Sequence, residues 1–444
     1  MKSIGLDIGT TTISAVIVDQ SQTIQDVVTT ENNTFLPGAS HEKVQDARKI
    51  EQLAMDLFQT CLERCQCAVS VGITGQMHGI VYLDQEGNLL SPLYTWQDGR
   101  GNLPYNGELT WSEHLSSLSG YPLATGYGIV THCYNLAHNL VPPNTSVLCT
   151  IQDYIAMKLA GQTAPKIDPT DAASLGCYNA NLHCFDEEAL KRIGVDPKIL
   201  PEVANDPLLG ITADGMRVFC AIGGNQASFL GATDNTEDVL LLNVGTGGQI
   251  SMHSNEKIET QTLEARPYMD GGCLLVGSLL CAGRSFALLE QFFRDTVQMV
   301  TGVDTPVYPA VNRTLAEVTS CTDYPRFSTT FQGTRQDPTL RGSITELSVD
   351  NFTPVHFMYG MMYGIAEEMH AMYRDYLQAG GKQAATIVGS GNGLRKNPNL
   401  CQIISEVFQC QLSLSQHQEE AAYGAAVYAL LGSNCGTHSD ESCA

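Results

Sequence analysis

The sequence predicts an α/β fold built from two duplicated domains around a central cleft. The first observation is a hairpin pattern at residues 5–16, where an apolar strand runs through a Gly-Thr turn into a second β-rich strand. The second is a repeat of this pattern at residues 242–251, with one extra residue in the turn. The third is a series of short buried strands that run into helices. Duplication across about half of the chain indicates two homologous domains that face each other.

The repeat sets the expected domain boundaries. We expect an N-terminal domain at residues 1–231 and a C-terminal domain at residues 232–434, followed by a polar tail at 435–444 that is expected to be disordered. Within them, residues 42–61 predict an amphipathic helix, and residues 168–174 predict a polar turn. A helix over residues 227–232 is expected to follow a buried strand and the turn at 223–226.

Composition excludes several classes of function. The 444 residues carry a formal net charge of −23, so surfaces for nucleic acid or anionic membrane are not expected. No stretch approaches the roughly 20 apolar residues of a transmembrane helix, and the first strand begins without an apolar signal region. We therefore expect a soluble, cytoplasmic protein. Its oligomeric state is left open, with a homodimer as one option.

The fifteen cysteines are scattered and odd in number. Cys61, Cys65 and Cys67 cluster near one helix, but no C-x-x-C pair with metal-ligand spacing accompanies them. Reduced, buried thiols in a cytosolic protein are the favoured interpretation.

Each Gly-Thr turn is a candidate phosphate site, because glycine permits close backbone approach while threonine adds hydroxyl donors. Asp7 ends the first strand, where one carboxylate would hold a hydrated Mg²⁺. The alternative is an ordinary N-terminal hairpin. The candidate residues are Gly9, Thr10, Thr11 and Thr12 in the first turn and Gly245, Thr246, Gly247 and Gly248 in the second.

Two polar clusters follow neighbouring strands and indicate a site for a polyhydroxylated ligand. Gln76 and His78 alternate at the end of a buried strand, where α/β proteins place ligand contacts. Trp96 offers an aromatic face for C–H groups, and Asp98 and Arg100 offer hydrogen bonds to hydroxyls. The alternatives are a turn histidine bonded to nearby backbone and a surface Asp–Arg ion pair that contributes little.

A third glycine-rich loop, residues 389–393, follows a predicted strand. It matches only half of a dinucleotide fingerprint, since the third spaced glycine and the downstream acidic residue are absent. Gly389, Gly391 and Asn392 are candidates for packing against adenine and ribose instead. The chain has no G-x-x-x-x-G-K-[ST] motif, which excludes a P-loop.

Together these motifs resemble the FGGY carbohydrate kinases, whose domains have the actin/hexokinase (ribonuclease H-like) fold. The resemblance spans residues 1–432. It is carried by the paired Gly-Thr hairpins and by residues 75–79 (GQMHG), 96–100 (WQDGR) and the Gly391 region. Within the family, the sedoheptulokinases are most similar and the xylulokinases next, on residues 95–100, 125–128, 152–154 and 172–174.

The resemblance implies ATP-dependent transfer of the γ-phosphoryl group to a terminal hydroxyl of a small ketose, with sedoheptulose as the first candidate. Asp7 would assist Mg²⁺, the two turns would hold the ATP phosphates, and the 389–392 loop would border adenosine. The residues that would line the ketose pocket are Gln76, His78, Trp96, Asp98 and Arg100.

One position departs from the family pattern. The catalytic aspartate expected just before Asn225 falls on Gly224, so the general base has no side chain. Loss of a general base typically costs about 10²–10⁴-fold in rate. The implied function is therefore an impaired kinase. The alternatives are a xylulokinase-like pentulose kinase and a non-catalytic protein that binds sugar or nucleotide.

Overall fold

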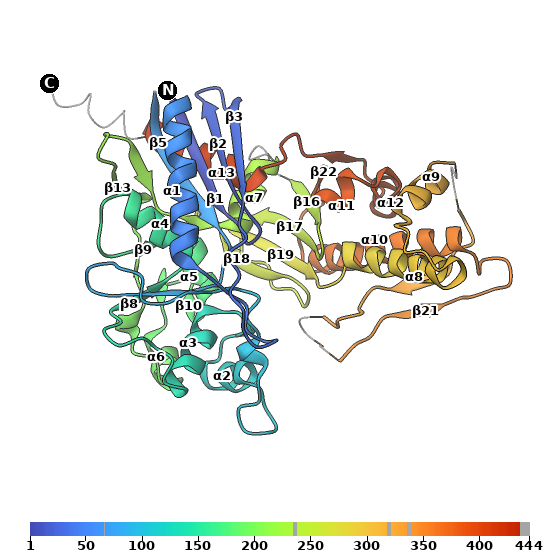
Figure 1. Ribbon diagram of the computed structural model, residues 1–444, viewed down its shortest axis with the longest axis horizontal. Helices are drawn as coiled ribbons and strands as arrows, with labels where there is room; N and C mark the ends of the chain where they lie inside the picture. The colour runs from blue at the N-terminus through green and yellow to red at the C-terminus, as the bar shows by residue number, and fades with distance from the viewer. Residues whose placement is uncertain (66, 234–237, 318–320, 335–336, 338, 436–444) are drawn as a thin grey trace. The chain divides into compact units, whose positions relative to one another are not determined.

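The chain forms two compact units in the computed structural model. The structure describes residues 1–65, 67–233, 238–317, 321–334, 337 and 339–435. Unit 1 comprises residues 1–231, 267–269 and the segment from Glu419 onward, and unit 2 comprises residues 232–266 and 270–418. The last helix, α13 (Glu420–Cys435), follows unit 2 in sequence but packs on the sheet of unit 1 (Figure 1).

Unit 1 is built on a mixed seven-stranded sheet, in the order β13-β14-β5-β1-β2-β3, with β15 also paired to β5. β1, β2 and β3 form an antiparallel meander, whereas β5 runs parallel to β1 and β14 runs parallel to β5. The strands are β1 (Lys2–Ile8), β2 (Thr12–Asp19), β3 (Ile24–Glu31), β5 (Ala68–Gly75), β13 (Leu208–Ile211), β14 (Arg217–Phe219) and β15 (Ile222–Gly223).

Helices cover both faces of this sheet, as the alternation along β2 requires. Ile13 and Ile17 lie in the core that includes α1 (Ala47–Arg64) and α4 (Ile151–Leu159). Val16 and Val18 point to the opposite face and pack with α13 and with Leu230 of α7 (Gly224–Thr233). Figure 1 shows α1 lying along the sheet of unit 1.

A second hydrophobic core in unit 1 includes Tyr82, Ile129 and Leu175. The side chains of this core come from short strands and helices. The helical elements here are η1 (Gly99–Asn102), α2 (Trp111–Ser119), α3 (Gly128–Ala137), α5 (Pro169–Leu175), α6 (Glu187–Arg192) and η2 (Pro197–Ile199). The remaining short strands of unit 1 are β4 (Val44–Gln45), β6 (Val81–Leu83), β7 (Leu93–Tyr94), β8 (Val147–Cys149), β9 (Lys166–Ile167), β10 (Tyr178–Asn179), β11 (Cys184–Phe185) and β12 (Glu202–Val203).

The sheet of unit 2 repeats five strands of the sheet of unit 1, with β19-β17-β16-β22-β23 corresponding to β3-β2-β1-β5-β14. This sheet has the order β18-β19-β17-β16-β22-β23, in which β16, β17 and β19 form the antiparallel meander and β22 and β23 run parallel to β16. The strands of this sheet are β16 (Val239–Val244), β17 (Gly248–Ser254), β18 (Glu264–Pro267), β19 (Cys273–Leu279), β22 (Thr386–Ser390) and β23 (Leu412–Leu414). A separate two-stranded antiparallel sheet is formed by β20 (Arg326–Ser328) and β21 (Ser343–Thr345). The helices are α8 (Gly283–Thr301), α9 (Tyr308–Glu317), α10 (Pro354–Gln378), α11 (Asn392–Arg395) and α12 (Pro398–Phe408).

The shared strand order confirms the predicted α/β fold and its duplication. β16 corresponds to β1, β17 to β2 and β22 to β5, so the two Gly-Thr turns occupy equivalent places in their sheets. None of the described helices has the length and apolar character needed to cross a membrane.

One local prediction was wrong, and two predicted helices are present with different bounds. Residues 168–174 form most of α5 rather than a turn, because Asp168 caps the helix by accepting from Thr170 N and Pro169 occupies its first turn. The helix expected at 42–61 begins at Ala47, after the cap Asp46. α7 begins at Gly224 itself, three residues before the predicted start. The expected disorder of the tail concerns residues 436–444, which lie outside the described residues; Cys435 ends α13.

Candidate active site

The β1–β2 turn presents its backbone as an anion site would require. Its three carbonyl groups accept hydrogen bonds from inside the protein: Asn32 Nδ2 donates to Gly9 O at 2.8 Å, Gln45 Nε2 to Thr10 O at 2.9 Å, and Asn32 N to Thr11 O at 2.8 Å. Among the described residues, the N–H groups of Thr10 and Thr11 donate to no backbone carbonyl. A turn whose carbonyls are held inward leaves its N–H groups available for a phosphate.

The β16–β17 turn also has carbonyls held by N–H groups of the protein, but it contains a bond of its own, from Gly245 N to Gly247 O at 2.9 Å. Gly283 N donates to Gly245 O at 3.1 Å, and Arg284 N donates to Thr246 O at 2.9 Å. Both donors belong to the first residues of α8, so the helix start fixes the turn. Gly283 must stay a glycine, because a Cβ there would lie 2.2 Å from Gly245 O.

Asp7 is the penultimate residue of β1, close to the first turn, and is half-buried. Burial, with a further contribution from the charge of Glu419, raises the pKa of Asp7 to about 7. The described residues contain no cluster of three or more His, Cys, Asp or Glu side chains able to hold a metal ion. Mg²⁺ usually takes one or two carboxylates and fills its shell with water and substrate phosphates, so Asp7 fits such an ion when a nucleotide is present.

The structure brings Gln76 and Trp96 to the first turn. Trp96 Nε1 donates to Thr10 Oγ1 at 3.0 Å, and Thr10 Oγ1 donates to Gln76 Oε1 at 3.4 Å. Gln76 Nε2 in turn donates to Gln45 Oε1 at 2.9 Å. Trp96 remains 45% exposed, so its ring is accessible to a ligand. These contacts link residues of the two predicted clusters through the phosphate turn.

His78 lies next to this group in an unusual backbone conformation, with φ of 72°. Its Nδ1 is 2.7 Å from Ser174 O, so this nitrogen carries the proton and donates, and its backbone N donates to Ser174 Oγ at 3.1 Å. The imidazole also stacks on Tyr127 at 4.6 Å between ring centroids. His78 is therefore held by residues distant in sequence rather than by its own turn.

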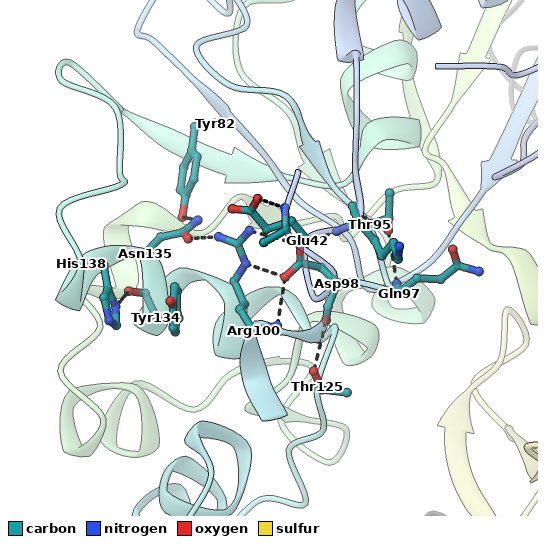
Figure 2. Close-up of polar contacts among 12 residues, drawn as sticks. Glu42, Tyr82, Thr95, Gln97, Asp98, Arg100, Thr125, Tyr134, Asn135 and His138 are labelled. Carbon is teal, nitrogen blue, oxygen red and sulfur yellow. Dashed lines mark hydrogen bonds and ion pairs between the residues drawn. The ribbon is translucent and has the colours of Figure 1, made fainter. Parts of the chain in front are cut away.

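Asp98 and Arg100 form a buried ion pair rather than the surface pair considered above. Arg100 Nε lies 2.5 Å from Asp98 Oδ1 and Nη2 lies 3.1 Å from Asp98 Oδ2, while Nη1 donates to Asn135 (Figure 2). The guanidinium carbon lies 4.5 Å from the centre of the Tyr94 ring, and Asn135 Nδ2 donates to Tyr82 Oη. The observed partners of both groups are protein atoms, and direct contact with a sugar stays a prediction.

Buried carboxyl groups lie close to Gly75, the last residue of β5, and Gln152 connects Gly75 to them. Gln152 Nε2 donates to both oxygens of Asp171 at 3.1 and 3.2 Å, while Asp153 accepts from Thr150 in a capping box. Burial raises the pKa of Asp153 to about 8 and also raises the pKa of Asp171. The capping-box spacing from Thr150 to Asp153 was the available sequence signal for part of this network.

Gly224 is closely packed where the family's carboxylate was expected. A Cβ at this position would lie 2.5 Å from Gly75 O, a backbone atom of β5. The backbone around α7 is thus arranged for glycine, and a larger residue requires a shift of one of these segments.

The adenosine candidates lie in unit 2, where β22 ends. Gly391 has φ of 84°, and a Cβ there would lie 2.6 Å from Val244 O, so glycine is required. Asn392 begins α11, and Gly389 pairs with Leu242 in the parallel β16–β22 ladder. Asn243 Nδ2 donates to Ser390 Oγ at 2.7 Å and ties this loop to the strand that carries the second turn.

Sequence analysis missed Asn32 and Gln45. Neither lies in a Gly-rich motif, and their contacts with the first turn span 23 and 35 residues of sequence. The spacing of polar residues alone gave no signal for them.

Comparison with known proteins extends over both units. The model of the N-terminal domain of the FGGY family of carbohydrate kinases matches residues 3–207, and that of its C-terminal domain matches residues 240–433. Similar curated proteins include sedoheptulokinase from Mus musculus, 24% identical over 96% of this chain and 97% of the relative. Xylulose kinase from Staphylococcus xylosus is 25% identical over 97% of this chain and 90% of the relative.

Solved structures share the fold. A xyloylose kinase from Brucella ovis has a TM-score of 0.83 and 19% identity, and covers 98% of this chain and 91% of its own. Glycerol kinase from Plasmodium falciparum, solved with ADP, has a TM-score of 0.81 and 18% identity, with coverage of 97% and 89%. From the two domain matches, which together span most of the sequence, we conclude that this chain belongs to the FGGY family of carbohydrate kinases.

Proposed function

We propose that this protein phosphorylates a terminal hydroxyl of a ketose with ATP, with sedoheptulose as the first substrate to test and xylulose the second. The observation that best supports nucleotide binding is the first turn, whose three carbonyl groups all accept hydrogen bonds from the protein. Similarity to sedoheptulokinase and xylulose kinase supports the choice of sugars. In this proposal residues 1–231 bind the sugar and phosphate, and residues 232–434 bind ATP through the second Gly-Thr turn and the 389–392 loop.

The residues would divide the chemistry as follows. The N–H groups of the two Gly-Thr turns would bind phosphate oxygens, and Asp7 would hold Mg²⁺, which neutralises phosphate charge when bound. Gln76 would bind a sugar hydroxyl, and Trp96 would cover the C–H face of the sugar. The buried ion pair of Asp98 and Arg100 would act indirectly, by fixing the position of the segment that carries Trp96.

The proposal includes impaired turnover. No carboxylate stands at Gly224 to accept the hydroxyl proton, and the position has no space for one without a backbone shift. Phosphoryl transfer depends mainly on positioning and charge stabilisation, so a reduced rate is expected rather than none. This same observation favours the second candidate, a protein that binds sugar and nucleotide without turnover.

The test is ADP formation with ATP, Mg²⁺ and a panel of ketoses and polyols, run beside thermal stabilisation by each ligand. Ketose-dependent ADP supports the kinase. Stabilisation by nucleotide and ketose without ADP supports the binding protein. If neither ATP nor any sugar stabilises the folded chain, both candidates are wrong.

A further inference from the structure

Gln45 lies on a short segment that joins the parts of the site in unit 1. Its strand β4 pairs with β7, with Val44 opposite Tyr94 and Gln45 opposite Leu93. The neighbouring Lys43 adds two contacts: its carbonyl accepts from Thr95 Oγ1 at 2.7 Å, and its N–H donates to Asp98 Oδ2 at 3.0 Å. The backbone around Gln45 is therefore fixed to the segment that leads to Trp96.

The side chain of Gln45 contacts both halves of the candidate site. It is fully buried, with Nε2 donating to Thr10 O at 2.9 Å and Oε1 accepting from Gln76 Nε2 at 2.9 Å. The bond from Thr10 Oγ1 to Gln76 Oε1 closes a ring of three residues. Only a group with a donor and an acceptor side by side satisfies both neighbours, because Thr10 O can only accept and Gln76 Nε2 can only donate.

We propose that Gln45 is a positioning residue that couples the phosphate turn to the sugar-binding side chain, so that each ligand raises the affinity for the other. This inference rests on the proposed function, since it takes Thr10 as part of the nucleotide site and Gln76 as part of the sugar site. A sugar hydroxyl that orders Gln76 also orders Gln45, and through it the carbonyl of Thr10. The turn N–H groups are then fixed before the phosphate arrives, which reduces the ordering cost of nucleotide binding.

The decisive variant is Gln45→Glu, which keeps the shape but replaces the donor to Thr10 O with a carboxylate oxygen. Gln162→Glu is the matched control, because Gln162 Nε2 also donates to a backbone carbonyl of unit 1, Leu209 O at 2.5 Å. Gln45→Met provides a neutral variant of similar volume without either hydrogen bond. Thermal melts establish that each variant is folded at the assay temperature.

The measurement is the Kd of ADP by calorimetry, with and without saturating sedoheptulose or xylulose. In the parent and in Gln162→Glu, we expect the sugar to lower the Kd of ADP about 10-fold, a typical coupling between two sites. In Gln45→Glu and Gln45→Met, the sugar should change it by less than about 2-fold. A purely structural role would lower the melting temperature and leave the coupling ratio intact.

The outcomes separate this inference from the function on which it rests. A parent protein that binds neither ADP nor sugar overturns the proposed function. A parent that binds both without coupling, or folded Gln45 variants that keep the parent's coupling ratio, overturns the role of Gln45 alone.

Discussion

Restoring a carboxylate at Gly224 is the most direct test of how this chain acts on its substrates. Two opposing effects are expected. A positioned general base contributes about 10²–10⁴-fold to the rate. The added Cβ, however, would lie 2.5 Å from Gly75 O, and overpacking of this kind typically costs about 1–3 kcal/mol of stability. Comparison with the parent alone would mix the two effects.

The variant Gly224→Ala separates the effect of the carboxylate from that of the added Cβ, because it carries the same Cβ without the carboxylate. We expect both variants to melt below the parent, and Gly224→Asp to exceed Gly224→Ala by at least about 100-fold in ketose-dependent ADP formation. The assay is a coupled ADP measurement at saturating ATP and sugar, on samples shown to be folded and to bind ADP. Equal rates for the two variants would refute the idea that an absent base limits this chain. A parent that already matches Gly224→Asp would refute the proposed impairment.

Three further predictions follow from the buried charges. Arg100→Met leaves the Asp98 carboxylate buried without its partner and should lower the free energy of unfolding in urea by about 3–5 kcal/mol; a loss below 1 kcal/mol would contradict the structural role of the pair. Burial raises the pKa of Asp153 to about 8, so the folded state binds an extra proton and stability falls as the pH rises from about 4 to about 8. The melting temperature of Asp153→Asn should therefore fall less steeply than that of the parent between pH 5 and pH 9. An equal slope in the two proteins would contradict the raised pKa of Asp153. Asp7→Asn should abolish the difference in ADP affinity between Mg²⁺ and EDTA buffers; a persisting difference would place the ion elsewhere.

Local sequence signals predicted the fold and much of the candidate site. The duplicated Gly-Thr turns were visible because each is a short pattern between two strands, and the strand order of the two sheets confirms the duplication. The start of α5 at Asp168-Pro169 is also a local signal, since Asp is a common N-cap and Pro is common in the first helical turn, but the same polar residues are equally typical of a turn. The burial of Asp98 and Arg100 was not predictable in this way. It depends on Tyr94, Asn135 and their neighbours, which come together only in the folded chain.

The two turns show why their supporting residues could not be found by comparing the repeats. In unit 1 the turn carbonyls are held largely by side chains, Asn32 and Gln45, which come from a strand end and a short edge strand. In unit 2 the same task falls to the backbone N–H groups of Gly283 and Arg284 at the start of α8. Any residue except proline could supply the N–H at position 284, whereas position 283 must remain glycine because a Cβ there would lie 2.2 Å from Gly245 O. Duplication therefore preserved the place of the turn in its sheet, between the first two strands of the meander, but not the groups that hold it. Removing a side-chain donor should therefore disturb the first turn, through Asn32 or Gln45, whereas the second turn is sensitive to an added side chain at Gly283. The importance of Gln45 could not be predicted from the second turn, because no side chain has the same role there.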